Sequence, residues 1–350
     1  MNVDQLDWNA LERLRGAFLS GTAGRAVYWK SMTDLASYDA SFGERIGWKW
    51  DAVLAELRRR GWQPPAGSVY DFGCGSGIAG RRMIREWGVK HLPVLRVQDR
   101  SSIAEQFALE RAKSEFPELA VERFTADEPL TPQSGPATLV VSHVISELAP
   151  ADRQRLMEWL PRFDAVIWVE PGTHADSHAL VEVREAVRTQ MRVVAPCTHE
   201  KTCGLTAPEN GRHWCHSFGK PPGGVFADGD WVRFAQRMGI DLRSLPYSFL
   251  VLDRRVGVAC GGDEAGEMSR VLGHPRVYKG YAKLFNCCAR GVEEITLQRR
   301  TDPGLFKRLD RGTHCGLFRW VLDGGTVREA AEVGGNPEET ILGEAEDPIP

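Results

Sequence analysis

The residues with the clearest capacity for chemistry lie in one stretch, APCTHEKTCGLTAPENGRHWCHSF, at positions 195–218. It holds Cys197, Cys203 and Cys215, separated by five and eleven residues. Thiolates are soft ligands that suit zinc or an iron–sulfur cluster, and this spacing is not that of a zinc finger. The stretch has many loop formers and too little apolar periodicity to build a core of its own. We therefore expect a bound metal to order it.

A tetrahedral site needs a fourth ligand, which must come from elsewhere in the chain or from a histidine within the stretch. The candidates are Cys287, Cys288, His199, His213 and His216. Spacing alone leaves zinc, an iron–sulfur cluster and a chance grouping open.

A second candidate site is the glycine-rich stretch VYDFGCGSGIAG at residues 69–80. Asp71, Gly73, Gly75 and Gly77 alternate with other residues between an apolar strand and a helical pattern. Glycines at such positions let the backbone turn tightly and approach a ligand closely. Dinucleotide-binding enzymes use G-x-G-x-x-G instead. The alternating glycines, with an acid two residues before the first, resemble motif I of class I S-adenosylmethionine (SAM) methyltransferases, whose loop holds the methionine end of SAM.

Two further acids follow the next strands in the order that such a fold needs. Asp99 ends the second predicted strand, 22 residues after Gly77, and Asp127 follows the third. In the methyltransferases that the motif resembles, the acid at the end of the second strand, here Asp99, accepts hydrogen bonds from the ribose hydroxyls. Asp127 fits a contact to the adenine amino group.

The acceptor side carries no recognised catalytic motif. The segment after the fourth strand reads HVISE, from His143 to Glu147, where amino-group methyltransferases of bases carry an Asn/Asp-Pro-Pro-aromatic motif. His143 is either a general base or a satisfied polar group at a strand end. Pro196–Cys197 resembles the nucleophile context of C5-pyrimidine methylation, but it follows the fifth strand. The catalytic residue stays unknown, and whether the protein is an enzyme stays open.

The elements that must position these groups are strands that alternate with helices. Apolar spacing near 3.6 predicts helices within residues 5–60, and strands then alternate with helices up to residue 194. This alternation predicts an α/β fold with a parallel, doubly wound sheet. After residue 225 the apolar pattern has period two, which predicts a β-rich C-terminal part.

Composition and charge describe an ordinary soluble protein of 350 residues, 42% of them apolar. No apolar run reaches the ~18 residues of a membrane span, and the first residues resemble neither a signal nor a transit peptide. We therefore expect a cytoplasmic, bacterial protein without membrane contact. Residues 321–350 carry eight acids and one base, so the net charge of −3 leaves +4 on the rest. The arginines of 81–85 and the segment 307–311 are the best candidates to contact RNA.

At the level of longer motifs, the sequence resembles a family: the methyltransferase-like assembly factors of the mitochondrial small ribosomal subunit, which have bacterial relatives. The matching segments fall in family order over most of residues 67–320. They are the cysteine stretch, ATLVVSHVISELAP, WVEPGTHADSHALVEVREAVR, YSFLVLDRR, RVLGHPRVYKGYAKLFNCCARG and a final FRW.

This resemblance implies a class I SAM fold, a [4Fe–4S] cluster on four cysteines and binding to small-subunit ribosomal RNA. Carried over, the ligands are Cys197, Cys203, Cys215 and Cys287, with Cys288 as the runner-up for the fourth place. His199 and His216 then become hydrogen-bond donors around the cluster rather than ligands.

The predicted organisation has five parts. They are a helical N-terminal extension (1–62), a SAM-binding Rossmann-like domain (63–194), a Cys/His-rich cluster-binding segment (195–225), the remaining sheet strands with a β-rich part (226–320), and an acidic, disordered tail (321–350).

The predicted function is that of a SAM-binding, iron–sulfur-containing, methyltransferase-like protein that acts on the small ribosomal subunit. It would bind rRNA or a 30S precursor and would assist assembly or methylate rRNA. The alternative is a zinc-containing SAM-dependent methyltransferase of a small molecule or a protein. The sequence indicates no oligomeric state.

Overall fold

The first part of the chain is helical and lies against one face of a large sheet. The computed structural model describes residues 1–21, 27–125, 135–257 and 268–333. The N-terminal helices are α1 (Trp8–Leu19), α2 (Met32–Tyr38) and α3 (Glu44–Arg59), with one π-helical turn, Asp39–Gly43, before α3. Apolar side chains of α3, among them Trp50 and Leu54, are buried in the core, as the 3.6-residue spacing predicts.

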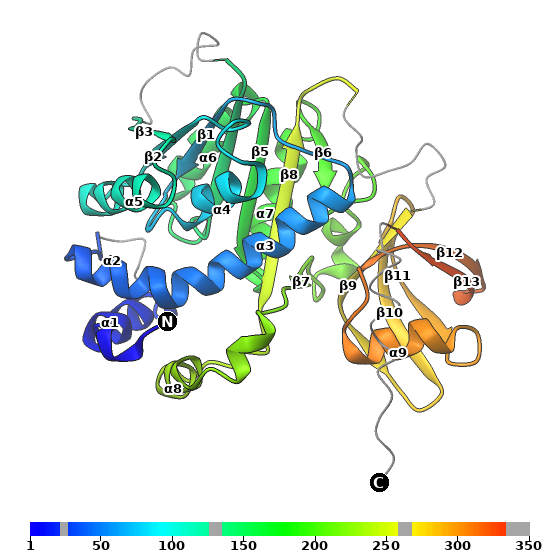
Figure 1. Ribbon diagram of the computed structural model, residues 1–350. Helices are drawn as coiled ribbons and strands as arrows, with labels where there is room; N and C mark the ends of the chain where they lie inside the picture. Colours follow the sequence, from blue (N-terminus) through cyan, green and yellow to red (C-terminus); the bar gives the residue numbers. More distant parts are fainter. Residues whose placement is uncertain (22–26, 126–134, 258–267, 334–350) are drawn as a thin grey trace.

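The large sheet is mixed and has the strand order β3-β2-β1-β4-β5-β8-β6, with the short β7 paired to β8 (Figure 1). The strands are β1 (Ser68–Phe72), β2 (Val94–Gln98), β3 (Ala120–Arg123), β4 (Ala137–Ser142), β5 (Ala165–Pro171), β6 (Arg192–Ala195), β7 (Ser217–Phe218) and β8 (Pro246–Asp253). The first five are parallel to one another, and β8 is antiparallel to both β5 and β6.

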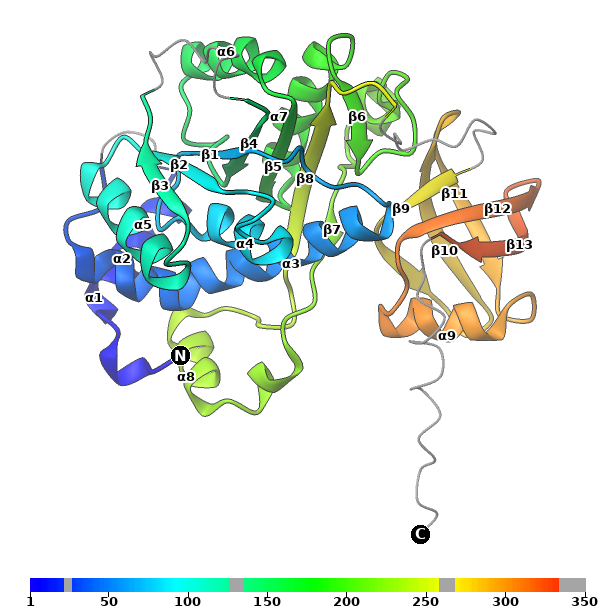
Figure 2. The same cartoon turned by 45° about the horizontal axis from the view of Figure 1, so that its top comes forward.

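Helices cover both faces of this sheet (Figure 2). One core joins α3, α4 (Ile78–Trp87) and α5 (Ser102–Glu115) to the strands. The other joins α6 (Pro150–Trp159) and α7 (His174–Val187) to the opposite face. The doubly wound, Rossmann-like prediction is confirmed. The antiparallel insertion of β8 between β5 and β6 was not predicted, because a strand buried on both faces carries no signal of direction.

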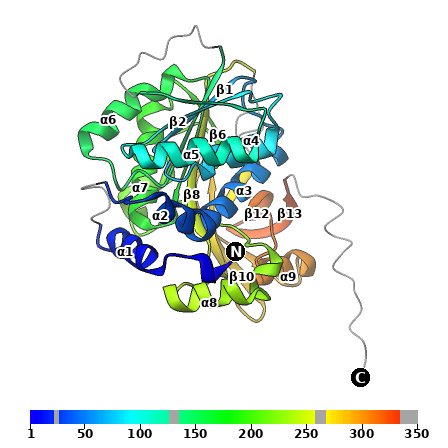
Figure 3. The ribbon, with the colours of Figure 1, turned by 60° about the vertical axis from the view of Figure 1, so that its left-hand side comes forward.

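A further helix, α8 (Gly229–Met238), lies beside the N-terminal helices (Figure 3). Its apolar face packs Trp231, Phe234 and Met238 against Leu11 of α1 and Trp48 of α3. The chain thus closes the helical layer with a segment more than 200 residues away in sequence from α1.

The C-terminal β-rich part is a closed five-stranded barrel beside the sheet (Figures 1 and 2). Its elements are β9 (Met268–Val277), β10 (Tyr281–Cys288), β11 (Gly291–Gln298), α9 (Pro303–Arg311), β12 (Leu317–Asp323) and β13 (Thr326–Glu332). The barrel closes in the order β10-β11-β13-β12-β9. Leu284, Ile295 and Phe318 fill its interior, and Phe306 of α9 packs against them.

The prediction of a disordered acidic tail from residue 321 is wrong for residues 321–333. They form the end of β12 and all of β13, with Val327 fully buried in the barrel core. The signal that acidic composition obscured is Asp323-Gly324-Gly325, a turn sequence between two strands. Residues 334–350 lie outside the described part of the chain.

A buried group of charges joins the barrel to the sheet. The Glu56 carboxylate of α3 forms ion pairs with Arg60 and with Arg270 of β9, and all three side chains are buried. Arg270 and Arg60 also donate to the Pro196 carbonyl, at 2.7 and 2.9 Å. Burial raises the pKa of Glu56, but the two arginines outweigh it and hold the pKa below its usual value. The contact therefore depends on a charged carboxylate.

Within the described residues, no helix is long and apolar enough to cross a membrane.

Candidate functional site

The glycine-rich turn lies between β1 and α4, and its three glycines have different surroundings. Gly73, Gly75 and Gly77 all have positive φ, at +65°, +52° and +76°. A Cβ at Gly73 or Gly77 would lie 2.9 Å from a side-chain carbon of Val144 or Ala108. A Cβ at Gly75 would meet only Trp29, at 3.9 Å. Two of the glycines therefore permit close packing, whereas the middle one leaves space for a ligand.

Asp99 lies at the end of β2 and is held against this turn. Its carboxylate accepts hydrogen bonds from the Gly75 and Ser101 amides, each at 2.9 Å. Burial raises the pKa of Asp99. The predicted ribose acceptor is thus next to the glycine that faces the open space.

Asp71, predicted on the same motif, lies behind the turn. Its Oδ2 accepts from the Gly80 amide at 3.0 Å, which ties the first turn of α4 to the end of β1. Burial raises the pKa of Asp71 to about 7. Neither Asp71 nor Gly77 lines the cavity described below. Their contribution is to fix the turn. Asp127 lies outside the described residues.

A cavity of about 860 Å³ opens at the carboxyl ends of the parallel strands. It lies between β1 and β4, where the strand order reverses, which is the usual ligand position in doubly wound sheets. Gly75 and Asp99 line one side, and Tyr28, Trp29 and Tyr38 of the N-terminal segment line another. Cavities of roughly 300–1,000 Å³ hold small molecules and cofactors in proteins.

A partly buried polar pair also lines this cavity. Lys49 Nζ lies 3.1 Å from His143 Nε2, and Ser142 Oγ lies 3.3 Å from His143 Nδ1. Burial and the neighbouring Lys49 hold the pKa of His143 well below its usual value, so the imidazole is neutral at pH 7. Burial and the Arg45 charge lower the pKa of Lys49 to about 8.

His143 also has a left-handed backbone, with φ of +58°, which is rare outside glycine. The sequence pointed to His143 but missed Lys49, which is 94 residues earlier on α3. The available signal was a lysine between two tryptophans, Trp48 and Trp50, both of which are buried.

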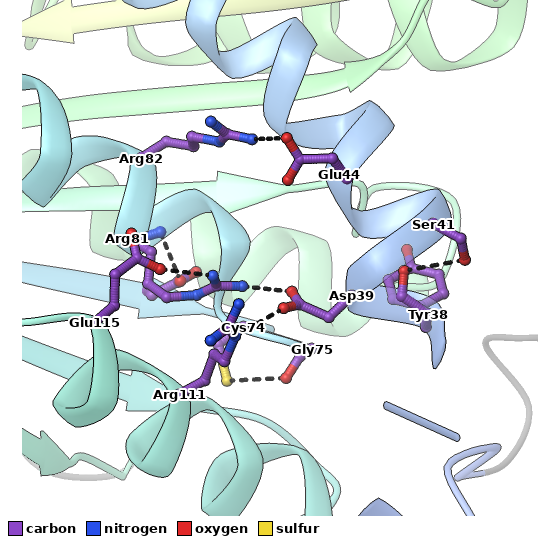
Figure 4. Close-up of polar contacts among 12 residues, drawn as sticks. Tyr38, Asp39, Ser41, Glu44, Cys74, Gly75, Arg81, Arg82, Arg111 and Glu115 are labelled. Atoms are coloured by element: carbon purple, nitrogen blue, oxygen red, sulfur yellow. Dashed lines mark hydrogen bonds and ion pairs between the residues drawn. The ribbon is translucent and has the colours of Figure 1, made fainter. Parts of the chain in front are cut away.

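The arginines of α4 were predicted to contact RNA, and that prediction is wrong for the first two. Arg81 is buried in ion pairs with Asp39 and Glu115, and Arg82 is buried beside Glu44 (Figure 4). Arg85 pairs with Glu115 as well. The charges hold the π-helical turn before α3 onto α4 and α5, and so they position the wall of the cavity.

The predicted metal ligands meet at the junction of sheet and barrel. Cys197 follows β6, Cys203 and Cys215 lie in the loop before β7, and Cys287 is on β10. All four line one small cavity of about 30 Å³. Cys288, one residue further, points to another side and does not line it.

Positive charge faces the four sulfurs. Arg184 Nε of α7 lies 3.2 Å from Cys197 Sγ, and the same guanidinium donates to the carbonyls of His199 and Lys201 at 3.0 and 2.9 Å. Burial and the nearby Cys197 raise the pKa of Cys203 to about 11, and similar causes raise the pKa of Cys215 and Cys287. Four thiols that line one small cavity would ionise together only with a cation among them.

The histidines of the stretch differ in position. His199 lines the cysteine cavity, with its Nε2 3.9 Å from Cys287 Sγ. His213 stacks on Phe285, with ring centroids 4.1 Å apart, and His216 stacks on Trp214. In the part of the chain that the structure describes, no three His, Cys, Asp or Glu side chains are arranged around a single metal ion.

Comparison with known proteins gives one family match. A family model described as Mitochondrial small ribosomal subunit Rsm22 matches residues 49–302, which include the glycine turn and all four cysteines. No curated protein matches the chain.

Among solved structures, the chain is similar to magnesium protoporphyrin IX methyltransferase from Synechocystis PCC 6803 with bound SAM. The identity is 13%, over 70% of this chain and 97% of that one, with a TM-score of 0.39. It is also similar to a putative RNA methyltransferase from Pyrococcus horikoshii, at 10% identity over 59% of this chain and 82% of that one, with a TM-score of 0.35.

Proposed function

The chain belongs to the Rsm22 family of the mitochondrial small ribosomal subunit, and on that premise we propose a SAM-binding, iron–sulfur-containing, methyltransferase-like protein that acts on the small ribosomal subunit. Its partner is small-subunit rRNA, free or in a 30S precursor. The observation that carries the proposal is the position of Gly75 and Asp99 together at the switch point of the sheet, beside a cavity of cofactor size.

Bound SAM would supply an electrophilic methyl group. Gly75 leaves room beside the turn for the methionine end, and Asp99 offers a carboxylate to the ribose hydroxyls. Tyr28, Trp29 and Tyr38 would supply an aromatic wall for the bound cofactor. We place the adenine contact at Asp127, as the sequence order predicts.

Lys49 and His143 are the groups of this cavity that can handle a proton on the acceptor side. In the arrangement seen, the lysine donates to His143 Nε2, so this nitrogen is engaged. Methyl transfer needs a base with a free lone pair, and His143 gains one only if an acceptor displaces Lys49. This arrangement supports binding of SAM more directly than it supports turnover.

The four cysteines would hold a [4Fe–4S] cluster as thiolates, with Arg184 offsetting their charge. The cluster would act as a structural cross-link between the sheet and the barrel. His199 lies close enough to Cys287 to donate a hydrogen bond to a ligating sulfur.

The test uses full-length protein purified without oxygen. We expect calorimetry to detect SAM or S-adenosylhomocysteine, chemical analysis to find about four irons and four sulfides per chain, and sedimentation to recover the protein with small-subunit precursors. Absence of SAM binding would remove the cofactor assignment. Colourless protein with one zinc per chain, a methyl acceptor among small molecules or proteins, and no ribosomal material would favour the zinc-containing methyltransferase instead.

A further inference from the structure

The strand connections of the C-terminal barrel carry information about a ligand. Numbered along the chain, its five strands close in the order 1-2-3-5-4, with a helix between the third and the fourth. The third and fifth strands, β11 and β13, pair in parallel, and the other neighbours are antiparallel. This is the connectivity of an OB-fold, whose second and third strands and 1–2 and 4–5 loops bind oligonucleotides or oligosaccharides.

Because fold alone does not assign function, the corresponding surface must itself suit a ligand. Tyr278 lies in the β9–β10 loop and Tyr281 begins β10. Both are exposed, at 44% and 39%, and their rings are stacked, with centroids 4.7 Å apart and planes 18° from parallel. Two exposed, parallel aromatic rings at the ligand-binding loop of this fold form a platform on which nucleobases can stack.

Outward side chains continue the platform along β10, because alternate residues of a strand point to the same side. Lys283 and Phe285 follow Tyr281 on this side. Phe285 is stacked by His213, so the cysteine-rich segment covers the far end of the face. The near end, at Tyr278 and Tyr281, is open.

The net charge of the barrel favours a polyanion over a neutral sugar as the ligand. Residues 268–333 contain 12 Lys and Arg against 7 Asp and Glu, a net charge of +5 in a chain whose total is −3. Lys279 lies between the two tyrosines in the sequence. Arg299 and Arg300 are exposed. They lie near the tyrosines, because the Arg299 amide donates to the Gly280 carbonyl at 2.9 Å.

Glu294 on this face forms ion pairs with Arg276 and Lys283, and Asp323, beside the β12–β13 loop, pairs with Arg328. Glu294 and its two partners together keep a charge of +1, and the pairs hold both cations on the face. The β12–β13 loop closes the other side of the surface, where the Gly325 carbonyl accepts from the Thr296 amide at 2.9 Å.

We propose that this barrel face binds single-stranded RNA, with bases stacked on Tyr278 and Tyr281 and phosphates at Lys279, Arg299 and Arg300. The choice of RNA over DNA rests on the proposed function. The binding surface itself rests on the topology, the exposed ring pair and the charge.

The experiment measures fluorescence anisotropy of a labelled 12-nucleotide single-stranded RNA of mixed sequence, and of a duplex of equal length, with the full-length protein. We expect the single strand to bind more tightly than the duplex. The double variant Tyr278→Ala/Tyr281→Ala should weaken it about ten-fold or more, since each base–aromatic stack is worth roughly 1–3 kcal/mol. The double variant with Phe at both positions should restore binding, because it keeps the rings.

Two further variants separate charge from stacking. Arg299→Gln/Arg300→Gln should lower the slope of log affinity against log salt by about 1.4, which corresponds to two phosphates on a single strand. Phe226→Ala, an exposed aromatic residue near α8, should change nothing.

Equal binding by wild type and the double Ala variant, or tighter binding of the duplex, would overturn the barrel assignment and leave the proposed function standing. Binding to small-subunit precursors without binding of the single strand would overturn it as well. If wild type binds neither oligonucleotide nor precursor, both the barrel assignment and the ribosomal part of the proposed function fail.

Discussion

The cavity at the switch point and the cysteine site are built in opposite ways. The cavity is formed around a strand, a turn and a helix that follow one another within residues 68–87. The cysteine site joins residues 90 positions apart, from a loop and from a separate barrel. The glycine turn of the cavity can form as soon as the parallel strands pair, whereas the cysteine site requires the sheet and the barrel to be docked. Changes at the cysteine site should therefore act on stability, and changes at the cavity on ligand affinity.

The largest effect should come from Cys287→Ser. Removing the proposed ligand from the barrel should abolish the proposed cluster, with loss of iron and of the broad absorbance near 400 nm that such clusters give. By analogy with a disulfide, a cross-link that closes a loop of ~90 residues is worth on the order of 4–5 kcal/mol. Limited proteolysis should then cut between sheet and barrel. Cys288→Ser is the matched control and should keep its iron, since that side chain does not line the cavity. Equal iron loss in both variants would show that the assignment of Cys287 as the fourth ligand is wrong.

A slightly smaller loss of stability should follow Glu56→Gln at the same junction. The change leaves the buried Arg60 and Arg270 without their carboxylate, and breaking a buried pair costs about 3–5 kcal/mol. Urea unfolding measures the loss. Glu86→Gln, whose partner Arg58 is exposed, should cost at most about 1 kcal/mol. A similar loss of unfolding free energy in the two variants would show that the ion pairs of Glu56 do not stabilise the junction.

The same carboxylate predicts a pH dependence. Since the folded pKa of Glu56 is below its unfolded value, its contribution is present above the unfolded pKa of about 4.3 and is lost as the pH falls through the folded one. The Glu56→Gln variant should not show this loss of stability at low pH.

An intermediate effect should distinguish two glycines of the turn. Gly77→Ala should destabilise the protein by roughly 1–3 kcal/mol, because a positive φ and a Cβ too close to Ala108 both add strain. Gly75→Ala shares the strain of a positive φ but has no close neighbour, so it should destabilise the protein less than Gly77→Ala and should also lower SAM affinity. Thermal unfolding measures the stability of both variants, and calorimetry measures their affinity for SAM. If Gly75→Ala leaves SAM affinity unchanged, the ligand lies elsewhere.

An effect of similar size, confined to SAM affinity, should follow Asp99→Asn. The amide keeps the shape but loses the charge, and one charge-assisted hydrogen bond is worth roughly 1.5–3 kcal/mol, or about ten-fold in affinity or more. Unchanged affinity in titration calorimetry, with the fold intact by circular dichroism, would show that Asp99 serves only to hold the Gly75 amide.

Local patterns explain what the sequence could predict. The order of β1 to β5, the glycine turn and the position of Asp99 all follow from a strand, its turn and the next helix. The period-two pattern after residue 225 predicted the β-rich part, and the Rsm22 resemblance was confirmed. The grouping of Cys287 with the other three cysteines came from that resemblance, since no spacing rule reaches across 90 residues.

What the sequence could not show depends on long-range contacts. Arg81 and Arg82 look like a basic surface until Asp39 and Glu44 arrive from the turn before α3. Lys49 belongs to the cavity only because α3 lies along the sheet. The barrel is closed by β13, which acidic composition concealed.

The position of β8 has a consequence for synthesis. It separates β5 from β6, yet it is made after both of them and after the whole cysteine-rich stretch. A nascent chain therefore leaves the place of β8 empty until residue 253 has emerged, and Cys197, Cys203 and Cys215 wait longer still for Cys287. At roughly 5–20 residues per second, the 90 residues between Cys197 and Cys287 take about 5–18 seconds to translate. During that interval the three cysteines lack their neighbour from the barrel, so the proposed cluster can be completed only after it.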